Sequence, residues 1–321
     1  MQQVMTTRAN RLWVRVPSLT RRQLGLWTGA LALRRVQLLT EWYRKKGVLM
    51  TAPHTIHDGT FTSEAVGRTL PYTILLPADF DAVSRYPVLY LLHGASGHHT
   101  DWPTLSRLVA HAAGLPLVIV CPEGENSCYI NGANGERWED MIVRDLPAHI
   151  EGTYPVRSDR GGRAIAGLSM GGFGAFNLGM RHPERYRAIS THSGAFMMNR
   201  YMGWMDTDPQ FAAVLGPVDS PVQREYDPQR VIAQAVQTHG PDTLPMLAMD
   251  TGTADSPMLI ASNRTLHRTL TALGVRHTYR ELLGGHTWEY WDREVPFTLQ
   301  FVAAAMGLVP AASTDTEADT Q

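Results

Sequence analysis

Short apolar runs alternate with helix-length segments through most of this chain, and the alternation limits the folds that it can adopt. Strand-like runs lie near residues 72–76, 88–92, 117–120, 164–168, 187–190, 246–249 and 278–282, and most of them are nearly continuously apolar. Such runs are typical of strands that are covered on both faces of a sheet. Helix-length segments lie between them, over 138–152, 170–182, 258–273 and 288–306. We therefore expect an α/β fold, in which a mostly parallel central sheet is flanked by helices.

The segment around residues 196–228 interrupts this alternation, because loops rich in glycine and proline stand where a helix is expected. We expect a short cap-like insertion there. Met197, Met198 and Trp204 lie in it and are candidates to line an acyl pocket, since flexible thioethers adapt to varied apolar shapes. Packing of the insertion itself explains them equally well. His93 and Trp288 are further candidates for the same pocket.

The run 167–171 reads Gly-Leu-Ser-Met-Gly and matches the G-x-S-x-G pattern of a nucleophilic serine. It stands where an apolar run meets a helical segment that contains Gly172 and Gly174. Small residues around Ser169 allow a sharp turn from strand to helix, which exposes the hydroxyl at the end of the sheet. The context predicts a nucleophile. The alternative is a glycine-rich turn with the same sequence pattern, in which the serine has no catalytic role.

A serine hydroxyl needs a neutral imidazole to accept its proton and a carboxylate to orient that imidazole. In the order serine, acid, histidine, the histidines that remain are His239, His267, His277 and His286. Only His286 follows a strand end and two glycines, in the kind of loop that carries functional groups at the carboxyl edge of a sheet. We therefore predict His286 as the base.

Two carboxylates compete for the role of the acid, because Asp250 and Asp255 follow the run at 246–249 on one loop. The distance of Asp255 from the strand end gives the loop room to reach His286. Asp250, at the strand end itself, is better placed to brace the loop. We favour Asp255, and Asp250 stays as the alternative.

The loop that follows the run at 88–92 reads His-Gly-Ala-Ser-Gly and predicts an oxyanion hole. Two backbone N–H groups are needed, and we expect them from Ala95 and from Met170, the residue after the nucleophile. His93, His98 and His99 crowd this loop, but no matching carboxylate cluster accompanies them, so we predict no metal and no other cofactor.

Four motifs in this order resemble the esterase D family of α/β-hydrolases. They are Tyr90-Leu91-Leu92-His93-Gly94, the glycine-rich run from Gly167 to Gly174, Gly252-Thr253-Ala254-Asp255, and the run from Gly285 to Trp291. The resemblance covers roughly residues 61–308. It implies Ser169, Asp255 and His286 as a catalytic triad and the amides of Ala95 and Met170 as the oxyanion hole. It is strongest for small tributyrin-type carboxylesterases.

Two departures separate the chain from other branches of that family. S-formylglutathione hydrolases typically carry histidine at the positions of Leu168 and Phe173. Mycolyltransferases usually lack a counterpart of His93 and tend to have alanine in place of Gly171. We therefore expect a serine carboxylesterase for short-chain or small aromatic esters. Acyl transfer, S-formylglutathione hydrolysis and a non-catalytic binding module on the same fold are the alternatives.

Charge and cysteine content exclude several other classes of protein. The net charge of −1 provides no basic field for nucleic acid. Cys121 and Cys128 have no zinc-like spacing and are read as packing residues. No uninterrupted apolar stretch is long enough for a membrane span. The expected partner is a small ester. The sequence does not decide whether the chain forms a homo-oligomer.

The two ends of the chain differ from its middle. Residues 1–50 form a basic extension, which reads as a twin-arginine-like export signal around Arg21 and Arg22, an amphipathic helix, or a misassigned start before Met50. Residues 51–310 are expected to form one domain and 311–321 a disordered tail. We expect a cytoplasmic protein, with export as the alternative.

Overall fold

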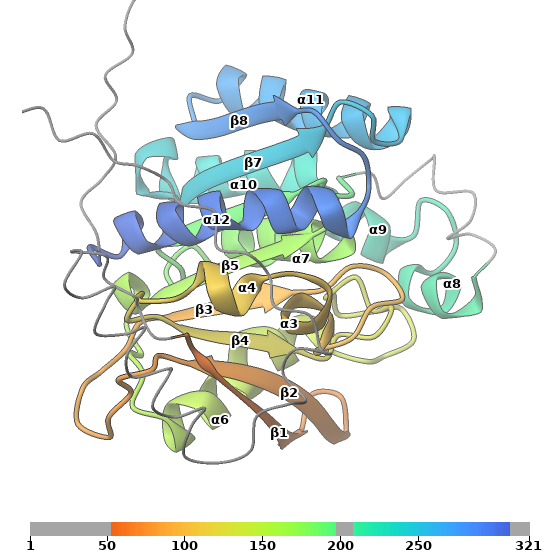
Figure 1. Ribbon diagram of the computed structural model, residues 1–321. Coiled ribbons are helices and arrows are strands. Elements are labelled where there is room, and N and C mark those ends of the chain that lie inside the picture. Colours follow the sequence, from red (N-terminus) through yellow and green to blue (C-terminus); the bar gives the residue numbers. More distant parts are fainter. Residues whose placement is uncertain (1–52, 197–207, 309–321) are drawn as a thin grey trace, which may run out of the picture. The chain divides into compact units, whose positions relative to one another are not determined.

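Eight strands form one sheet in the computed structural model, which describes residues 53–196 and 208–308 (Figure 1). Their order across the sheet is β1-β2-β4-β3-β5-β6-β7-β8. Strand β2 pairs antiparallel with β1 and β4, and every pairing from β4 through to β8 is parallel. The mostly parallel sheet is thus confirmed. The strands are β1 (Thr55–Ser63), β2 (Arg68–Leu76), β3 (Val88–Leu92), β4 (Val118–Pro122), β5 (Arg163–Leu168), β6 (Ala188–His192), β7 (Met246–Gly252) and β8 (His277–Leu282).

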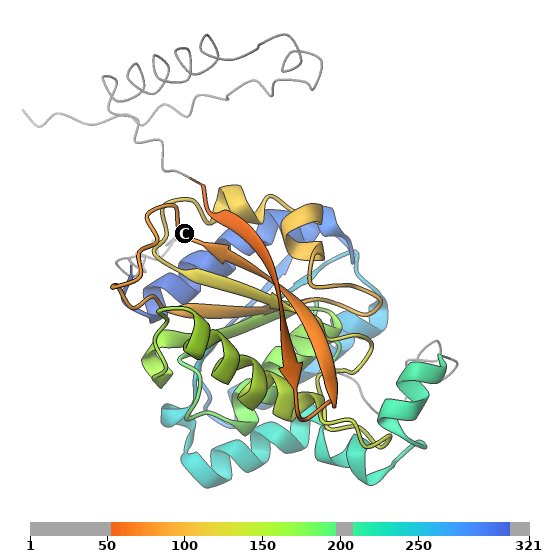
Figure 2. The same cartoon turned by 90° about the horizontal axis from the view of Figure 1, so that it is seen from below.

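The apolar pattern does not predict β1, which pairs with β2 along all nine of its residues at one edge of the sheet (Figure 2). Only Phe61 and Ser63 in this strand are buried. An edge strand that is covered so little has no apolar run to reveal it.

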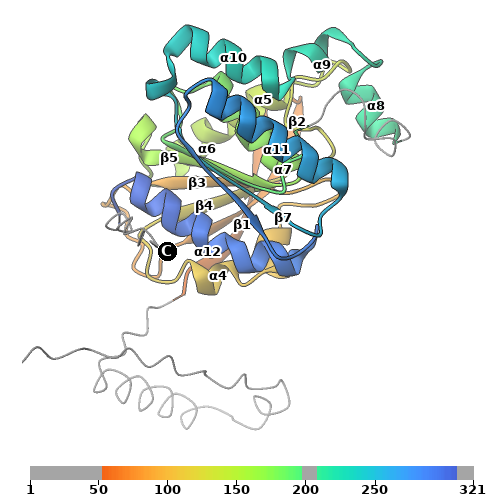
Figure 3. The ribbon, with the colours of Figure 1, turned by 90° about the horizontal axis from the view of Figure 1, so that it is seen from above.

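Helices cover both faces of the sheet (Figure 3). The side chains of the central strands are therefore apolar on both faces. Tyr90 and Ile165 pack on one side, with α5 to α7, α10 and α11. Leu89 and Ala164 pack on the other side, with α3, α4 and α12. The helices are α3 (Asp101–Leu105), α4 (Leu108–His111), α5 (Trp138–Asp140), η1 (Met141–Asp145), α6 (Leu146–Thr153), η2 (Arg160–Gly162), α7 (Met170–Arg181), α8 (Pro209–Leu215), α9 (Pro221–Glu225), α10 (Pro228–His239), η3 (Pro241–Thr243), α11 (Pro257–Ala272) and α12 (Trp288–Ala305).

The expected insertion is present between β6 and α10, where α8 and α9 project beyond the layer of helices (Figure 1). Met197, Met198 and Trp204 lie outside the described residues, as do the extension at 1–50 and the tail at 311–321. Among the helices that the structure describes, none is long and apolar enough to cross a bilayer. Cys121 and Cys128 are buried free thiols.

Candidate active site

Ser169 stands at the sharp turn between β5 and α7, with backbone angles φ 53° and ψ −117°. This conformation is strained for a residue with a Cβ, and the neighbouring backbone holds it in place. The Ser169 N–H donates to His192 O at 2.9 Å, and Ser169 O accepts from Ala195 N at 3.1 Å. The turn also needs Gly167, because a Cβ there would lie 2.4 Å from the carbonyl oxygen of Gly171.

His286 lies in the loop between β8 and α12 and faces both of its predicted partners. Its Nε2 is 2.9 Å from Ser169 Oγ, and its Nδ1 is 3.0 Å from Asp255 Oδ2. With the proton on Nδ1 donated to the carboxylate, Nε2 is free to accept the serine proton. Three residues that are far apart in the sequence thus form one chain of hydrogen bonds.

Asp255, and not Asp250, lies against His286. Only 5% of Asp255 is exposed. Burial by itself would raise the pKa of this carboxyl, but the hydrogen bond and the charge of His286 outweigh it, so the pKa lies below its usual value. Two backbone hydrogen bonds, from Thr253 N to Leu282 O and from Ala254 N to Gly284 O, join the Asp255 loop to the His286 loop.

Aromatic side chains of α12 and α3 pack behind the histidine. The ring of Trp291 stands perpendicular to the ring of His286, with 4.9 Å between their centres. Trp288, a predicted pocket residue, is half-buried between Trp291 and Trp102 and makes edge contacts with both rings. It therefore packs against the ring that contacts His286, and its place in an acyl pocket stays a prediction.

The predicted oxyanion loop lies directly against the nucleophile. A Cβ at Gly94 would be 2.6 Å from Leu168 Cδ1 and 3.4 Å from Ser169 Cβ, so only glycine allows this approach. Ala95, the next residue, is half-buried, and no described residue accepts its N–H. Met170 begins α7, and the first N–H of a helix has no acceptor within the helix.

His93 holds this loop from inside and does not line an open pocket, because its side chain is only 1% exposed. Its Nδ1 donates to Gly94 O at 2.7 Å, and its Nε2 accepts from Gly124 N at 2.9 Å. Its own carbonyl accepts from the Tyr129 hydroxyl at 3.0 Å. The sequence could not reveal this role, since Gly124 and Tyr129 reach His93 only through the fold.

Glu123, at the end of β4, ties the same loop to the next one and was missed by the sequence analysis. Its carboxylate accepts the N–H groups of His99, Gly124 and Glu125. Burial opposes the charge of this carboxylate, but His93 and the N–H groups of Glu125 and His99 lower the pKa of Glu123 to about 2. The loop next to Ser169 is thus anchored by a charged group.

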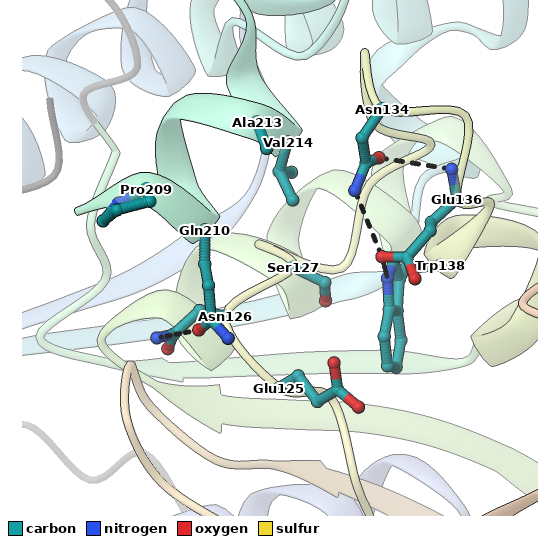
Figure 4. A pocket seen from close by; sticks show the side chains of 10 residues that line it. All are labelled: Glu125, Asn126, Ser127, Asn134, Glu136, Trp138, Pro209, Gln210, Ala213 and Val214. Carbon is teal, nitrogen blue, oxygen red and sulfur yellow. Dashed lines mark hydrogen bonds between the residues drawn. The ribbon is translucent and has the colours of Figure 1, made fainter.

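A cavity of about 340 Å³ lies beyond the oxyanion loop, between the loop after β4 and α8 (Figure 4). Asn126 forms part of its wall, where it accepts the N–H of Ser96 at 2.7 Å and donates to Gln210 at 3.0 Å. Within 53–196 and 208–308, no three His, Cys, Asp or Glu side chains gather as metal ligands. The cavity is lined by Glu125, Asn126, Ser127, Asn134, Glu136, Trp138, Pro209, Gln210, Ala213 and Val214.

Comparison with known proteins identifies the family of the chain. A family model described as "Putative esterase" matches residues 63–301. An acetyl esterase of Caldicellulosiruptor saccharolyticus is 26% identical, over 67% of this chain and 82% of the relative. An esterase of Mycobacterium tuberculosis is 28% identical over 71% of this chain, which spans only 55% of that protein.

Solved structures of esterases share the fold. A ferulic acid esterase is 26% identical, with a TM-score of 0.67 over 79% of this chain and 99% of that one. The fluorophosphonate-binding serine hydrolase F of Staphylococcus aureus is 23% identical, with a TM-score of 0.70 over 78% and 99% of the two chains. The chain therefore belongs to the esterase family that the model describes, and it is a carboxylic-ester hydrolase with the α/β-hydrolase fold.

Proposed function

We propose that this protein is a serine carboxylesterase in which Ser169, His286 and Asp255 form the catalytic triad. The observation that carries the proposal is the continuous chain of hydrogen bonds from Ser169 Oγ through His286 to Asp255, with distances of 2.9 and 3.0 Å. A hydroxyl, an imidazole and a buried carboxylate in this order suit nucleophilic attack on an ester carbonyl.

In the proposed reaction, Ser169 Oγ attacks the ester carbonyl carbon while His286 Nε2 takes its proton. The N–H groups of Ala95 and Met170 stabilise the negative oxygen of the tetrahedral intermediate. His286 then gives the proton to the leaving alkoxide, and the alcohol departs. Water, activated by His286, attacks the acyl-enzyme, and the acid is released with regeneration of Ser169.

Short acyl chains and small aromatic acids are the substrates that we favour. The names of the relatives, an acetyl esterase and a ferulic acid esterase, support this range. Leu168 and Phe173 stand where S-formylglutathione hydrolases typically have histidine, which makes a thioester of glutathione a less suitable substrate. Acyl transfer to an alcohol is the remaining alternative, and product analysis with an added alcohol distinguishes it from hydrolysis.

The experiment that tests the function compares 4-nitrophenyl acetate, butyrate and octanoate with methyl ferulate. We expect wild-type hydrolysis of the short or aromatic esters, and for Ser169→Ala a loss of kcat of at least about 1,000-fold, because the nucleophile is gone. Ser84→Ala, at an exposed serine before β3, is the matched control and should keep wild-type rates. Equal rates for wild type and Ser169→Ala contradict the proposal.

The location of the enzyme is a separate inference. We infer a cytoplasmic enzyme, and the two buried thiols that remain unpaired suit a reducing compartment. Cell fractionation of the full chain tests this inference, and export of the mature protein contradicts it.

A further inference from the structure

Asp250 forms the centre of a buried polar cluster beside the proposed triad. Only 2% of this residue is exposed. Its two carboxylate oxygens accept from His192 Nδ1 at 2.9 Å, from the Tyr290 hydroxyl at 2.8 Å and from Arg280 Nη2 at 3.1 Å. The three donors come from β6, α12 and β8, while Asp250 belongs to β7. One side chain therefore bonds to three other elements.

The hydrogen bond between Asp250 and His192 connects this cluster to the nucleophile. His192 is fully buried, and its second ring nitrogen lies 2.9 Å from Thr298 Oγ1, so both ends of the ring are held. The carbonyl of the same residue accepts the Ser169 N–H at 2.9 Å. The backbone of Asp250 reinforces this contact, because its carbonyl accepts from Ser193 N at 2.8 Å. Displacement of His192 would therefore displace Ser169.

The hydrogen bonds from Tyr290 and Arg280 connect the cluster to the loop that carries the base, His286. Tyr290 lies four residues after His286, and its ring packs so tightly under Gly284 that a Cβ there would be 2.6 Å from Tyr290 Cδ2. Arg280 lies in the strand that runs directly into the His286 loop. Asp255, the third member of the proposed triad, follows Asp250 on the same strand and loop.

We propose that Asp250 is the positioning residue of the active site, which sets the separation of Ser169, His286 and Asp255 through its hydrogen bonds to His192, Tyr290 and Arg280. It touches no reacting atom. Its action is indirect, because it holds His192, which accepts the Ser169 N–H, and Tyr290, which packs under the His286 loop. This role rests on the proposed esterase function.

A second buried carboxylate provides a matched control. Glu139 is also 2% exposed, and it also accepts from a histidine, an arginine and a tyrosine, namely His182, Arg181 and Tyr226. This cluster joins α5 to α7 and to the end of α9 and contacts no residue of the proposed triad. Loss of either carboxylate removes the same kinds of hydrogen bond, but only Asp250 adjoins the loops of the triad.

The experiment compares Asp250→Asn and Glu139→Gln with wild type. Asparagine keeps the shape of aspartate but offers one acceptor oxygen in place of two. Active sites are counted by the 4-nitrophenolate released on complete reaction with diethyl 4-nitrophenyl phosphate, and kcat for 4-nitrophenyl acetate is divided by that count. For Asp250→Asn we expect kcat per site about 10-fold lower at unchanged KM, because a small misplacement of reacting groups is costly.

Thermal unfolding separates positioning from stability. Both variants should unfold at a lower temperature than wild type, but Glu139→Gln should keep the wild-type kcat per site. Tyr290→Phe removes one hydrogen bond and leaves the ring packed on Gly284, so it provides a milder variant if Asp250→Asn does not fold. We expect from it a smaller fall in kcat, again at unchanged KM.

Wild-type kcat per site in Asp250→Asn or, should that variant not fold, in Tyr290→Phe would overturn the positioning role. An equal fall in Glu139→Gln would overturn it too, because general loosening of the fold would then be the cause. A wild-type protein that neither hydrolyses 4-nitrophenyl acetate nor reacts with the phosphate would instead overturn the proposed function, and the positioning role with it.

Discussion

At the scale of single residues, the site depends on positions where a side chain would not fit. Ser169 occupies a strained conformation that only a tightly held turn maintains. Gly167 precedes it, and Gly94 allows the oxyanion loop to approach it. The backbone around the nucleophile is therefore as specific as the side chains that react.

Substitution of Gly167 tests this dependence. The Cβ of Gly167→Ala would lie 2.4 Å from the backbone oxygen of Gly171, which can move only with the start of α7. We expect kcat for 4-nitrophenyl acetate to fall by about 10-fold or more, since the turn that carries Ser169 must shift. Gly152→Ala, where the new Cβ meets no atom within 4 Å, is the control and should keep its activity. Wild-type activity in Gly167→Ala speaks against a rigid turn.

At the scale of elements, buried carboxylates join helices and strands that lie far apart along the chain. Glu139 brings together α5 and the end of α7, and Tyr226 adds the end of α9. Burial opposes its charge, but the hydrogen bonds from His182 and Arg181 lower the pKa of Glu139 to about 2. The packing of these helices therefore depends on an ionised side chain.

This shift predicts how stability changes with pH. The pKa of Glu139 is lower in the folded state than its ordinary value of 4.5, so its contribution to stability is complete above pH 4.5 and is lost as the pH falls toward 2. In Glu139→Gln, the urea midpoint of unfolding should fall less steeply over this range than in wild type. Glu225→Gln, which removes an exposed partner of Arg181, should keep the wild-type slope. Parallel curves for Glu139→Gln and wild type contradict the assignment.

At the scale of the whole molecule, one sheet brings together the parts of the site. Ser169, Asp255 and His286 follow β5, β7 and β8, and the oxyanion loop follows β3. Because these strands are parallel, the loops after them meet at one edge, where such folds bind their ligands. All contacts of the site that the structure describes lie within residues 53–308.

Shortened chains test whether residues 53–308 contain the whole site. A chain that begins at Ala52 should hydrolyse 4-nitrophenyl acetate with the kcat of the full chain, since it keeps every strand of the sheet. A chain that begins at Arg68 lacks β1 and leaves the hydrogen-bonding edge of β2 open, which favours aggregation. We expect it to be insoluble or inactive, as measured by gel filtration and assay. Loss of activity in the chain from Ala52 would place part of the site in the first 51 residues.

The sequence by itself determined the fold class and two residues of the site, Ser169 and His286, because both depend on local signals. Parallel strands that are buried on both faces leave continuous apolar runs, and a nucleophile turn requires glycines within a few positions of Ser169. The family motifs then supplied the order of Asp255 and His286. Strand β1 was not predicted, because an edge strand buries too few side chains to leave such a run.

Only the tertiary structure decided which aspartate meets His286 and what His93 and Asp250 do. The sequence places Asp250 and Asp255 on one loop, but the structure places Asp250 inside β7 and Asp255 in the loop after it, next to the loop that follows β8. His93 bonds to Gly124, and Asp250 bonds to His192, across 31 and 58 positions of the chain. Partners so far apart leave no periodic signal, since strand pairing and helix packing, rather than neighbouring residues, bring them together.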